Sequence, residues 1–340
     1  MTYLMVLGGL VLLFMGGEAL VRGSVSIARK LNISELVIGL TLVGFGTSVP
    51  ELVTSLRAIG QGAVGIAVGN VVGSNIANIL LVLGLAAVIR PILTNPKALS
   101  RDGAVMVGVT ALLCALIWFD LFTRLAGFGL IGLLLAYLAY SLVADQKRDT
   151  HAGAMHAAEG EIVQAQYGLF VGLIIAVVGL AAVIIGARLL VDGGVSIARD
   201  FGISETIIGL TIVAVGTSLP ELATTAVAAY RGKSDVALGN IIGSNIFNVL
   251  GILGVTSLVQ PFSVRGHTAA GSMADGATTS LISPLDIGML VLSTVLLMFF
   301  AITRKRISRW EGAVLLLAYA TYFGLLFGLV PVPGILTNAR

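Results

Sequence analysis

The hexapeptide GTSVPE at residues 46–51 returns as GTSLPE at residues 216–221, 170 positions later in a chain of 340 residues. An ungapped comparison of residues 34–84 with residues 204–254 gives 27 identities in 51 positions, which chance does not produce. The identical positions are mainly Gly, Thr, Ser, Pro, Glu and Asn, which break helices or supply oxygen atoms. The chain therefore contains an internal duplication, and both copies share the same polar and helix-breaking residues.

The composition indicates the class of protein. Hydrophobic residues make up 57% of the chain, charged residues 11%, and the mean hydropathy is +1.03, whereas a soluble domain has about 25% charged residues. The apolar stretches reach the roughly 20 residues that a membrane-spanning helix needs, and a helix satisfies its own backbone groups in lipid. We therefore expect an all-α polytopic membrane protein, with the lipid bilayer as a partner and no nucleic acid partner. The expected spans cover residues 3–27, 35–58, 63–89, 103–119, 125–144, 168–197, 205–229, 235–259, 285–303 and 311–329.

Ten spans in two similar halves predict an inverted repeat, because an odd number of spans makes the second half enter the membrane from the opposite side. The expected organisation is a first repeat of five helices at residues 1–144, a linker at 145–166 and a second repeat of five helices at 167–340. Spans four and five resemble spans nine and ten only in hydropathy. In transporters built this way, the binding site lies near the midplane where broken helices of the two halves meet.

The basic residues predict the orientation. Thirteen of the Lys and Arg residues outside the spans fall on one side of the predicted layout and five on the other. Because short cytoplasmic loops retain Lys and Arg, we expect a multi-pass protein of the inner cell membrane with both termini outside and the linker in the cytoplasm.

Two acidic residues are expected at membrane depth. Glu51 lies near the middle of the second span and Glu221 near the middle of the seventh. A charged side chain there costs about 2.5–3.5 kcal/mol even on a lenient insertion scale, so an intramembrane acid indicates a functional site. The alternative is a protonated glutamate bonded to a neighbouring helix, and two acids in identical motifs make it the weaker interpretation.

The prolines beside these acids predict broken helices. Pro50 and Pro220 cannot donate to the carbonyls four residues earlier, at Gly46 and Gly216. Irregular backbone is tolerated at this depth only where it lines a cavity enclosed by protein. Hard cations such as sodium and calcium need several oxygen ligands. Further hydroxyl ligands expected beside the two breaks are Thr47, Ser48, Thr217 and Ser218.

A second motif is expected to supply the other wall of the site, as GNVVGSNIANIL at residues 69–80 and GNIIGSNIFNVL at residues 239–250. Its Ser and Asn residues lie one helical turn apart on one face, and they predict the ligands Ser74, Asn78, Ser244 and Asn248. The glycines at four-residue spacing predict close helix packing; they are Gly69, Gly73, Gly239 and Gly243. For the remaining asparagines we favour packing or capping; they are Asn70, Asn75, Asn240 and Asn245.

The paired GTS-x-PE and GN-x-x-GSNI-x-N motifs resemble the two alpha repeats of the sodium/calcium exchanger family, within the cation/calcium antiporter superfamily. The resemblance implies that Glu51 and Glu221 are shared calcium and sodium ligands, and that the other motif residues complete one calcium site and flanking sodium sites. Some members carry an aspartate at the position of Asn78 or Asn248. Animal members have a large central regulatory domain, whereas the linker here is short, so the chain resembles the compact prokaryotic exchangers.

The predicted function is secondary-active exchange of calcium for sodium, with the transported ions and no cofactor. Two carboxylates give the pocket a charge of −2, which one calcium or two sodium ions neutralise, so the ions compete. A calcium/proton antiporter is the alternative. A passive channel is disfavoured because conduction needs weak, sequential sites. An enzyme is not expected, since the chain has no paired aspartates, Ser-His set or HExxH motif. Ion stoichiometry, potassium involvement, transport direction and oligomeric state do not follow from the sequence.

The first and sixth spans are expected to be the moving part. They carry acid and base pairs four residues apart, Glu18 with Arg22 and Arg188 with Asp192, a spacing that places the partners on one helix face. We favour a structural role for these pairs over gating.

Overall fold

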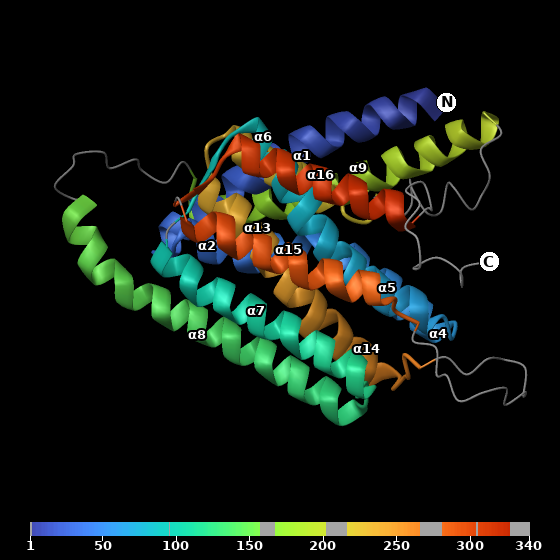
Figure 1. The fold of residues 1–340 in the computed structure, drawn as a ribbon. Helices are drawn as coiled ribbons and strands as arrows, with labels where there is room; N and C mark the ends of the chain where they lie inside the picture. The colour runs from blue at the N-terminus through green and yellow to red at the C-terminus, as the bar shows by residue number, and fades with distance from the viewer. Residues whose placement is uncertain are drawn as a thin grey trace, which may run out of the picture.

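A computed structural model describes residues 2–94, 96–156, 167–201, 216–265, 281–303 and 305–326, and the described chain is almost entirely helical (Figure 1). The elements of the first half are α1 (Thr2–Leu31), α2 (Glu35–Ile38), the π-helix η1 (Gly39–Val43), α3 (Gly44–Thr47), α4 (Val49–Gly60), α5 (Val64–Ala77), the π-helix η2 (Asn78–Leu83), α6 (Gly84–Ile89), β1 (Ile92–Leu93), α7 (Pro96–Phe119) and α8 (Arg124–His156). Those of the second half are α9 (Leu169–Asp200), α12 (Leu219–Tyr230), α13 (Ser234–Phe247), the π-helix η4 (Asn248–Leu253), α14 (Gly254–Val259), α15 (Pro284–Thr303), β2 (Arg306–Ile307) and α16 (Arg309–Leu326). Strands β1 and β2 pair antiparallel, with Ile92 opposite Ile307.

Eight of the ten expected spans have a counterpart among the apolar helices. Within the described residues, seven helices are long and apolar enough to cross a membrane, and the bent segment from α2 to α4 makes up to eight. The expected span 205–229 falls partly on 202–215, outside the described residues, and its described end forms α12. Helix α16 covers the span expected at 311–329 as far as Leu326, without being among those seven. Helix α8 continues into the expected linker as far as His156.

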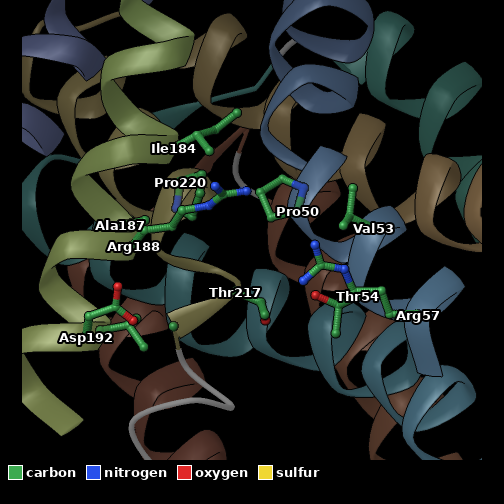
Figure 2. A pocket seen from close by; sticks show the side chains of 12 residues that line it. Pro50, Val53, Thr54, Arg57, Ile184, Ala187, Arg188, Asp192, Thr217 and Pro220 are labelled. Atoms are coloured by element: carbon green, nitrogen blue, oxygen red, sulfur yellow. The ribbon is translucent and has the colours of Figure 1, made fainter. Parts of the chain in front are cut away.

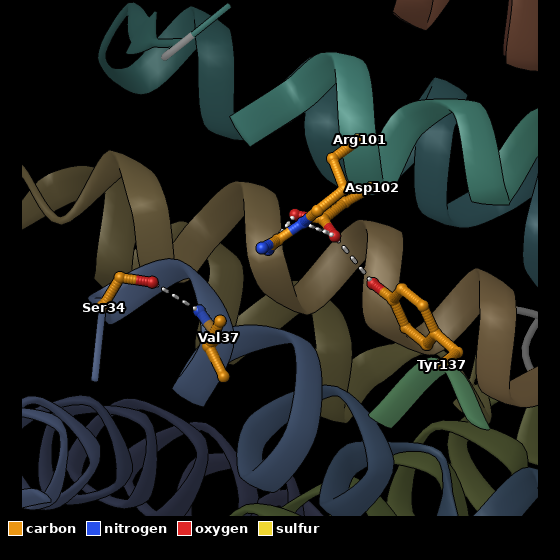
Figure 3. Close-up of polar contacts among 5 residues, drawn as sticks. All are labelled: Ser34, Val37, Arg101, Asp102 and Tyr137. Carbon is orange, nitrogen blue, oxygen red and sulfur yellow. Dashed lines mark hydrogen bonds and ion pairs between the residues drawn. The ribbon is translucent and has the colours of Figure 1, made fainter. Parts of the chain in front are cut away.

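The second span is interrupted, as the proline predicts. Ser34 starts α2 by accepting a hydrogen bond from the backbone of Val37 at 3.2 Å (Figure 3). The helix then passes through η1 and α3 and breaks at Ser48, whose φ of −86° and ψ of 7° are not helical. Helix α4 restarts with Pro50 in its first turn, where a missing N–H removes no helical bond, and the two parts meet at 42°.

The spans that carry the second motif form the centre of the molecule. In the most apolar 18-residue stretch of each span, 72% of the residues are buried in Val64–Ile89 and 83% in Ser234–Val259, whereas the share is 28–44% in the other apolar helices. Gly239 lies against Gly39, where an added Cβ would be 3.0 Å from the Gly39 Cα. The close approach predicted for the glycines is therefore present in the second copy, between α13 and the α2–η1 segment. It is wrong for Gly69 and Gly73 of the first copy, since no described atom lies within 4 Å of a Cβ added to either.

Helices α1 and α9 pack along most of their length in antiparallel directions (Figure 1). A Cβ added to Gly16 would lie 2.8 Å from the Gly179 carbonyl oxygen, and a Cβ added to Gly179 would lie 2.8 Å from that of Gly16. Glycines recur every seven residues along this contact, as Gly9, Gly16 and Gly23 on α1 and as Gly172, Gly179 and Gly186 on α9. Backbone therefore meets backbone, as small residues permit in membrane helices.

A hydrogen bond from a tyrosine to an aspartate joins the last two helices of each half. Tyr137 of α8 donates to Asp102 of α7 at 3.3 Å, and Arg101 binds the same carboxylate through two bonds of 2.8 Å (Figure 3). Tyr322 of α16 likewise donates to Asp286 of α15 at 2.8 Å. The halves thus share a polar contact here as well as hydropathy. Comparison at an offset of 170 misses it, because these residues are separated by more than 170 positions.

Candidate cation-binding site

The two glutamates lie at the starts of the helices that follow the breaks. Glu51 is in the first turn of α4 and Glu221 in the first turn of α12, with exposed fractions of 1% and 0%. The positive end of a helix dipole favours a carboxylate at this position. Ser48 Oγ donates to Glu221 Oε1 at 2.8 Å, so the break of the first half contacts the acid of the second.

Several buried oxygens at this point have no hydrogen-bond partner among the described residues. They are Glu51 Oε1 and Oε2, Glu221 Oε2, Asn78 Oδ1 and Asn248 Oδ1. Buried polar atoms are rarely left unpaired, since each costs about 1–3 kcal/mol. Neither glutamate forms an ion pair with a Lys, Arg or His among the described residues. A set of acceptors without donors is the environment that an oxygen-seeking cation satisfies.

Around these oxygens, helices of one half pack against helices of the other half. Helix α12, which carries Glu221, packs against η2, which begins at Asn78; α4, which carries Glu51, packs against η4, which begins at Asn248. The sequence did not indicate the π-helical turns, because their residues fit a continuous α-helix. Such wide turns are frequent at functional sites.

Four asparagines form cross-half hydrogen bonds beside the site. Asn248 Nδ2 donates to Asn75 Oδ1 at 2.9 Å, and Asn78 Nδ2 donates to Asn245 Oδ1 at 3.3 Å. Asn75 Nδ2 in turn donates to the backbone oxygen of Asn245 at 3.3 Å. All four side chains are at most 3% exposed. The sequence motif placed Asn75 and Asn245 next to expected ligands, but spacing alone did not indicate that they would bond to the opposite half.

The other two asparagines anchor the restarted helices. Asn70 Nδ2 donates to the Glu51 backbone oxygen at 3.2 Å and to Ser55 Oγ at 3.0 Å. Asn240 makes the equivalent bonds in the second half, at 3.4 Å to the Glu221 backbone oxygen and 2.8 Å to the Thr225 hydroxyl. This agrees with the structural role expected for them, since each holds the backbone of one glutamate.

The hydroxyl groups of the motifs also link the halves. Thr47 Oγ1 donates to Asn240 Oδ1 at 3.2 Å, and Ser244 Oγ donates to the Gly44 oxygen at 3.0 Å. Thr47 and Ser244 are completely buried. Of the remaining expected ligands, Ser74, Ser218 and Gly216 are buried, and Gly46 and Thr217 are half-buried.

A cavity of about 260 Å³ lies between the C-terminal half of α9 and the two helix breaks (Figure 2). Pro50 and Pro220 line it, and the guanidinium groups of Arg57 and Arg188 extend into it from α4 and α9. Asp192, expected to pair with Arg188, lines the same cavity, but neither forms an ion pair with another described residue. The expectation of a paired Arg188 and Asp192 is therefore wrong.

The corresponding part of α1, around Glu18, forms ion pairs. Glu18 pairs with Arg22 of its own helix, as expected, and also with Arg231 at the end of α12 at 2.6 Å. Lys233 pairs with Glu35 of α2 at 2.8 Å. A cavity of about 200 Å³ lies among these groups, lined by Glu18, Arg22, Arg231 and Lys233 among others.

Comparison with solved structures gives the same fold. Structures of the sodium-calcium exchanger NCX_Mj superpose on this chain with a TM-score of 0.76 when soaked with zero Na⁺ and Ca²⁺ and 0.77 when soaked with 2.5 mM Na⁺ and 1 mM Sr²⁺. Both are 34% identical to it; the first match covers 96% of this chain and 98% of that one, the second 97% and 99%.

Curated relatives agree over nearly the whole length. The putative antiporter CaxA of Alkalimonas amylolytica is 40% identical over 332 residues, covering 95% of this chain and 97% of the relative. The sodium/calcium exchanger MaX1 of Methanosarcina acetivorans is 37% identical, covering 96% and 98%. The family described as "Sodium/calcium exchanger protein" matches residues 1–143 and 171–328. With both motifs placed around two buried glutamates, this chain belongs to the sodium/calcium exchanger family.

Proposed function

We propose that this protein is a secondary-active antiporter that exchanges calcium for sodium through one site built on Glu51 and Glu221. The observation that carries the proposal is the set of buried oxygens on these glutamates, Asn78 and Asn248 that accept no hydrogen bond from the part of the chain that the structure describes. The names of MaX1 and NCX_Mj, both sodium/calcium exchangers, support the same pair of ions. The other predicted ligands complete the coordination: Thr47, Ser48, Ser74, Thr217, Ser218 and Ser244, with the backbone oxygens of Gly46 and Gly216.

Competition for the same oxygens would produce the exchange. Two carboxylates are neutralised equally by one calcium or by two sodium ions, so binding of one load displaces the other. An empty pocket with a charge of −2 is costly to carry through a low-dielectric closed state. Only loaded pockets then switch sides.

The proposed architecture is ten spans in two inverted repeats of five, at residues 1–144 and 167–340. The linker 145–166 lies on the cytoplasmic side and both termini lie outside. Helices α1 and α9 contact each other backbone to backbone, so they move as one body past the buried centre formed by α5 and α13. This motion would expose the two glutamates alternately to the two sides.

An exchange of three sodium ions for one calcium would make the transport cycle voltage-dependent, because one net charge then crosses the membrane per cycle. With Asn78 and Asn248 neutral and two carboxylates in the site, the calcium-loaded site has no net charge and the sodium-loaded site carries that one charge. One elementary charge crossing 100 mV corresponds to about 2.3 kcal/mol. Clamping vesicles at several potentials tests this, because an electroneutral cycle gives a flux that is indifferent to the potential.

Calcium uptake into proteoliposomes, with sodium, potassium and proton gradients imposed separately, tests the coupling ion. We expect uptake to follow the sodium gradient and to need no potassium. Uptake that is lost without sodium but restored by a pH gradient would identify the calcium/proton alternative. Flux that neither saturates nor counter-transports would identify a channel.

A further inference from the structure

The polarity of the Asn248 amide is fixed by a chain of hydrogen bonds that begins at a backbone carbonyl. A carbonyl oxygen only accepts, so Asn75 must present Nδ2 to the Asn245 oxygen, 3.3 Å away. Its Oδ1 then occupies the other branch of the amide, 2.9 Å from Asn248. Asn248 must meet that acceptor with its own Nδ2, which leaves its Oδ1 on the opposite side.

The symmetric chain at Asn78 has a weaker anchor. Asn245 Nδ2 points at the sulfur of Met106 at 3.8 Å, and its Oδ1 accepts from Asn78 Nδ2 at 3.3 Å. A thioether is a weak acceptor compared with a backbone carbonyl. The oxygen of Asn78 is therefore held less firmly than that of Asn248.

An asparagine that binds a cation must offer its oxygen, because the amide NH₂ has no free electron pair for a metal ion. The Oδ1 atoms of Asn78 and Asn248 are buried and accept no hydrogen bond from the described residues. A 180° rotation of either amide would put an NH₂ group in the place of this oxygen, and the site would lose one ligand for the ion.

We infer that Asn75 and Asn245 are positioning residues, which keep the amide oxygens of Asn248 and Asn78 turned toward the transported ions and the NH₂ groups turned away. This inference rests on the proposed cation site. Asn75 and Asn245 do not touch the ion. They exclude the amide rotamer that would turn NH₂ toward the ion, and Asn75 does so more strongly because of its carbonyl anchor.

A double-mutant cycle that replaces Asn248 by aspartate tests the inference. A carboxylate has an acceptor oxygen on each branch, so it needs no neighbour to decide which atom faces the ion. The variants are Asn75→Ala, Asn248→Asp and both together, in full-length protein reconstituted in liposomes. We expect Asn75→Ala to raise the half-saturating calcium concentration about tenfold, as the loss of one oxygen bond to a charged partner would. In the Asn248→Asp background the same change should have little effect, or a favourable one, because Asn75 Oδ1 would face a carboxylate oxygen.

Calcium-dependent shifts of the melting temperature of the purified variants supply a readout that does not need transport. If Asn75 only fills space, its replacement weakens calcium binding equally in both backgrounds, and that result would overturn the inference. Asn245→Ala with Asn78→Asp forms a second cycle, with a smaller coupling expected from the weaker Met106 anchor. It decides the question if Asn75→Ala does not fold. Failure of the proposed cation site looks different, since wild-type protein would then show no calcium-dependent shift at all.

Discussion

Glu18 on α1 and Arg188 on α9 hold equivalent positions 170 residues apart, yet the two ends of this helix pair differ. At one end Glu18 is bound by Arg22 and Arg231, which ties α1 to the end of α12. At the other end Arg188 and Asp192 form no ion pair with another described residue and line a cavity that reaches both prolines. The cavity at the Glu18 end is lined by the ion-paired groups and by neither proline, so the prolines are accessible from the Arg188 end.

The orientation expected from the basic residues assigns the two ends to opposite sides of the membrane. Arg231 and Lys233 belong to the side expected to be cytoplasmic, and Arg57 to the side expected to be outside. We therefore interpret the 260 Å³ cavity as an outer vestibule and the Glu18 cluster as a closed inner end. In the proposed cycle, two halves built on the same motifs give alternating access only if the two ends of the helix pair are not open at the same time.

The largest effect on calcium exchange is expected at the two buried carboxylates, of which each half supplies one. Glu51→Gln and Glu221→Gln should each lower calcium exchange at least about 100-fold, since an uncompensated change of buried charge costs on the order of 3–5 kcal/mol. Flux in proteoliposomes measures this. Glu311→Gln is the matched control, because Glu311 also sits in the first turn of a helix but caps Ser308 at 2.6 Å. Normal exchange by either folded site variant would remove the two-glutamate assignment.

The next effect tests whether α1 and α9 act as one body between the two ends. Gly16→Ala puts a Cβ 2.8 Å from the backbone of α9, and the overpacking should cost about 1–3 kcal/mol. We expect roughly tenfold slower exchange and a lower melting temperature. Gly8→Ala on the same helix is the control, since no described atom lies within 4 Å of its Cβ. Equal effects of the two substitutions would contradict the shared contact.

Glu18→Gln should weaken the closed end alone. Loss of two partly exposed ion pairs costs about 0.2–1 kcal/mol each, and it lowers the population of the state accessible from outside. The half-saturating external calcium concentration should rise about twofold to threefold. Arg22→Gln should do less, because Glu18 keeps Arg231. An unchanged or lower half-saturating concentration in Glu18→Gln would mean that these pairs do not hold the inner end.

The smallest effect is expected at the accessible end, where Arg188 repels an approaching cation. Arg188→Gln should lower the half-saturating external calcium concentration about twofold at low ionic strength, and Asp192→Asn should raise it. Salt screens such interactions beyond about 10 Å at 0.1 M, so both effects should vanish when an impermeant salt is added. Effects that persist in high salt would point to packing rather than to charge.

The sequence predicted those parts of the site whose residues are costly in a membrane. Glu51 and Glu221 stand out because lipid does not tolerate them, and Pro50 predicted the break found at Ser48 because a proline cannot donate. These are properties of single residues, so they can be read without knowing what packs against them.

Features that depend on the opposite half could not be predicted. The residues of the π-helical turns at Asn78 and Asn248 would fit an α-helix equally well. The side-chain hydrogen bonds of Asn75 and Asn245 join one half to the other, so neither half alone indicates them. The spacing of Arg188 and Asp192 permits an ion pair, but both line a cavity in the folded protein. The spacing of residues in the sequence shows which side chains share a face of one helix, whereas these contacts form between two helices.

The glycine contact of α1 and α9 has a consequence for the origin of the asymmetry. Gly9 meets Gly186 and Gly16 meets Gly179, which is one isologous contact, the kind that forms between identical subunits of a two-fold dimer. A half-length chain inserted in both orientations would make this contact between two copies. In such a homodimer, positions 18 and 188 would hold the same residue, and both ends would carry the same charge. A homodimer therefore cannot carry Glu at one end and Arg at the other, whereas this fused chain does, with Glu18 and Arg188.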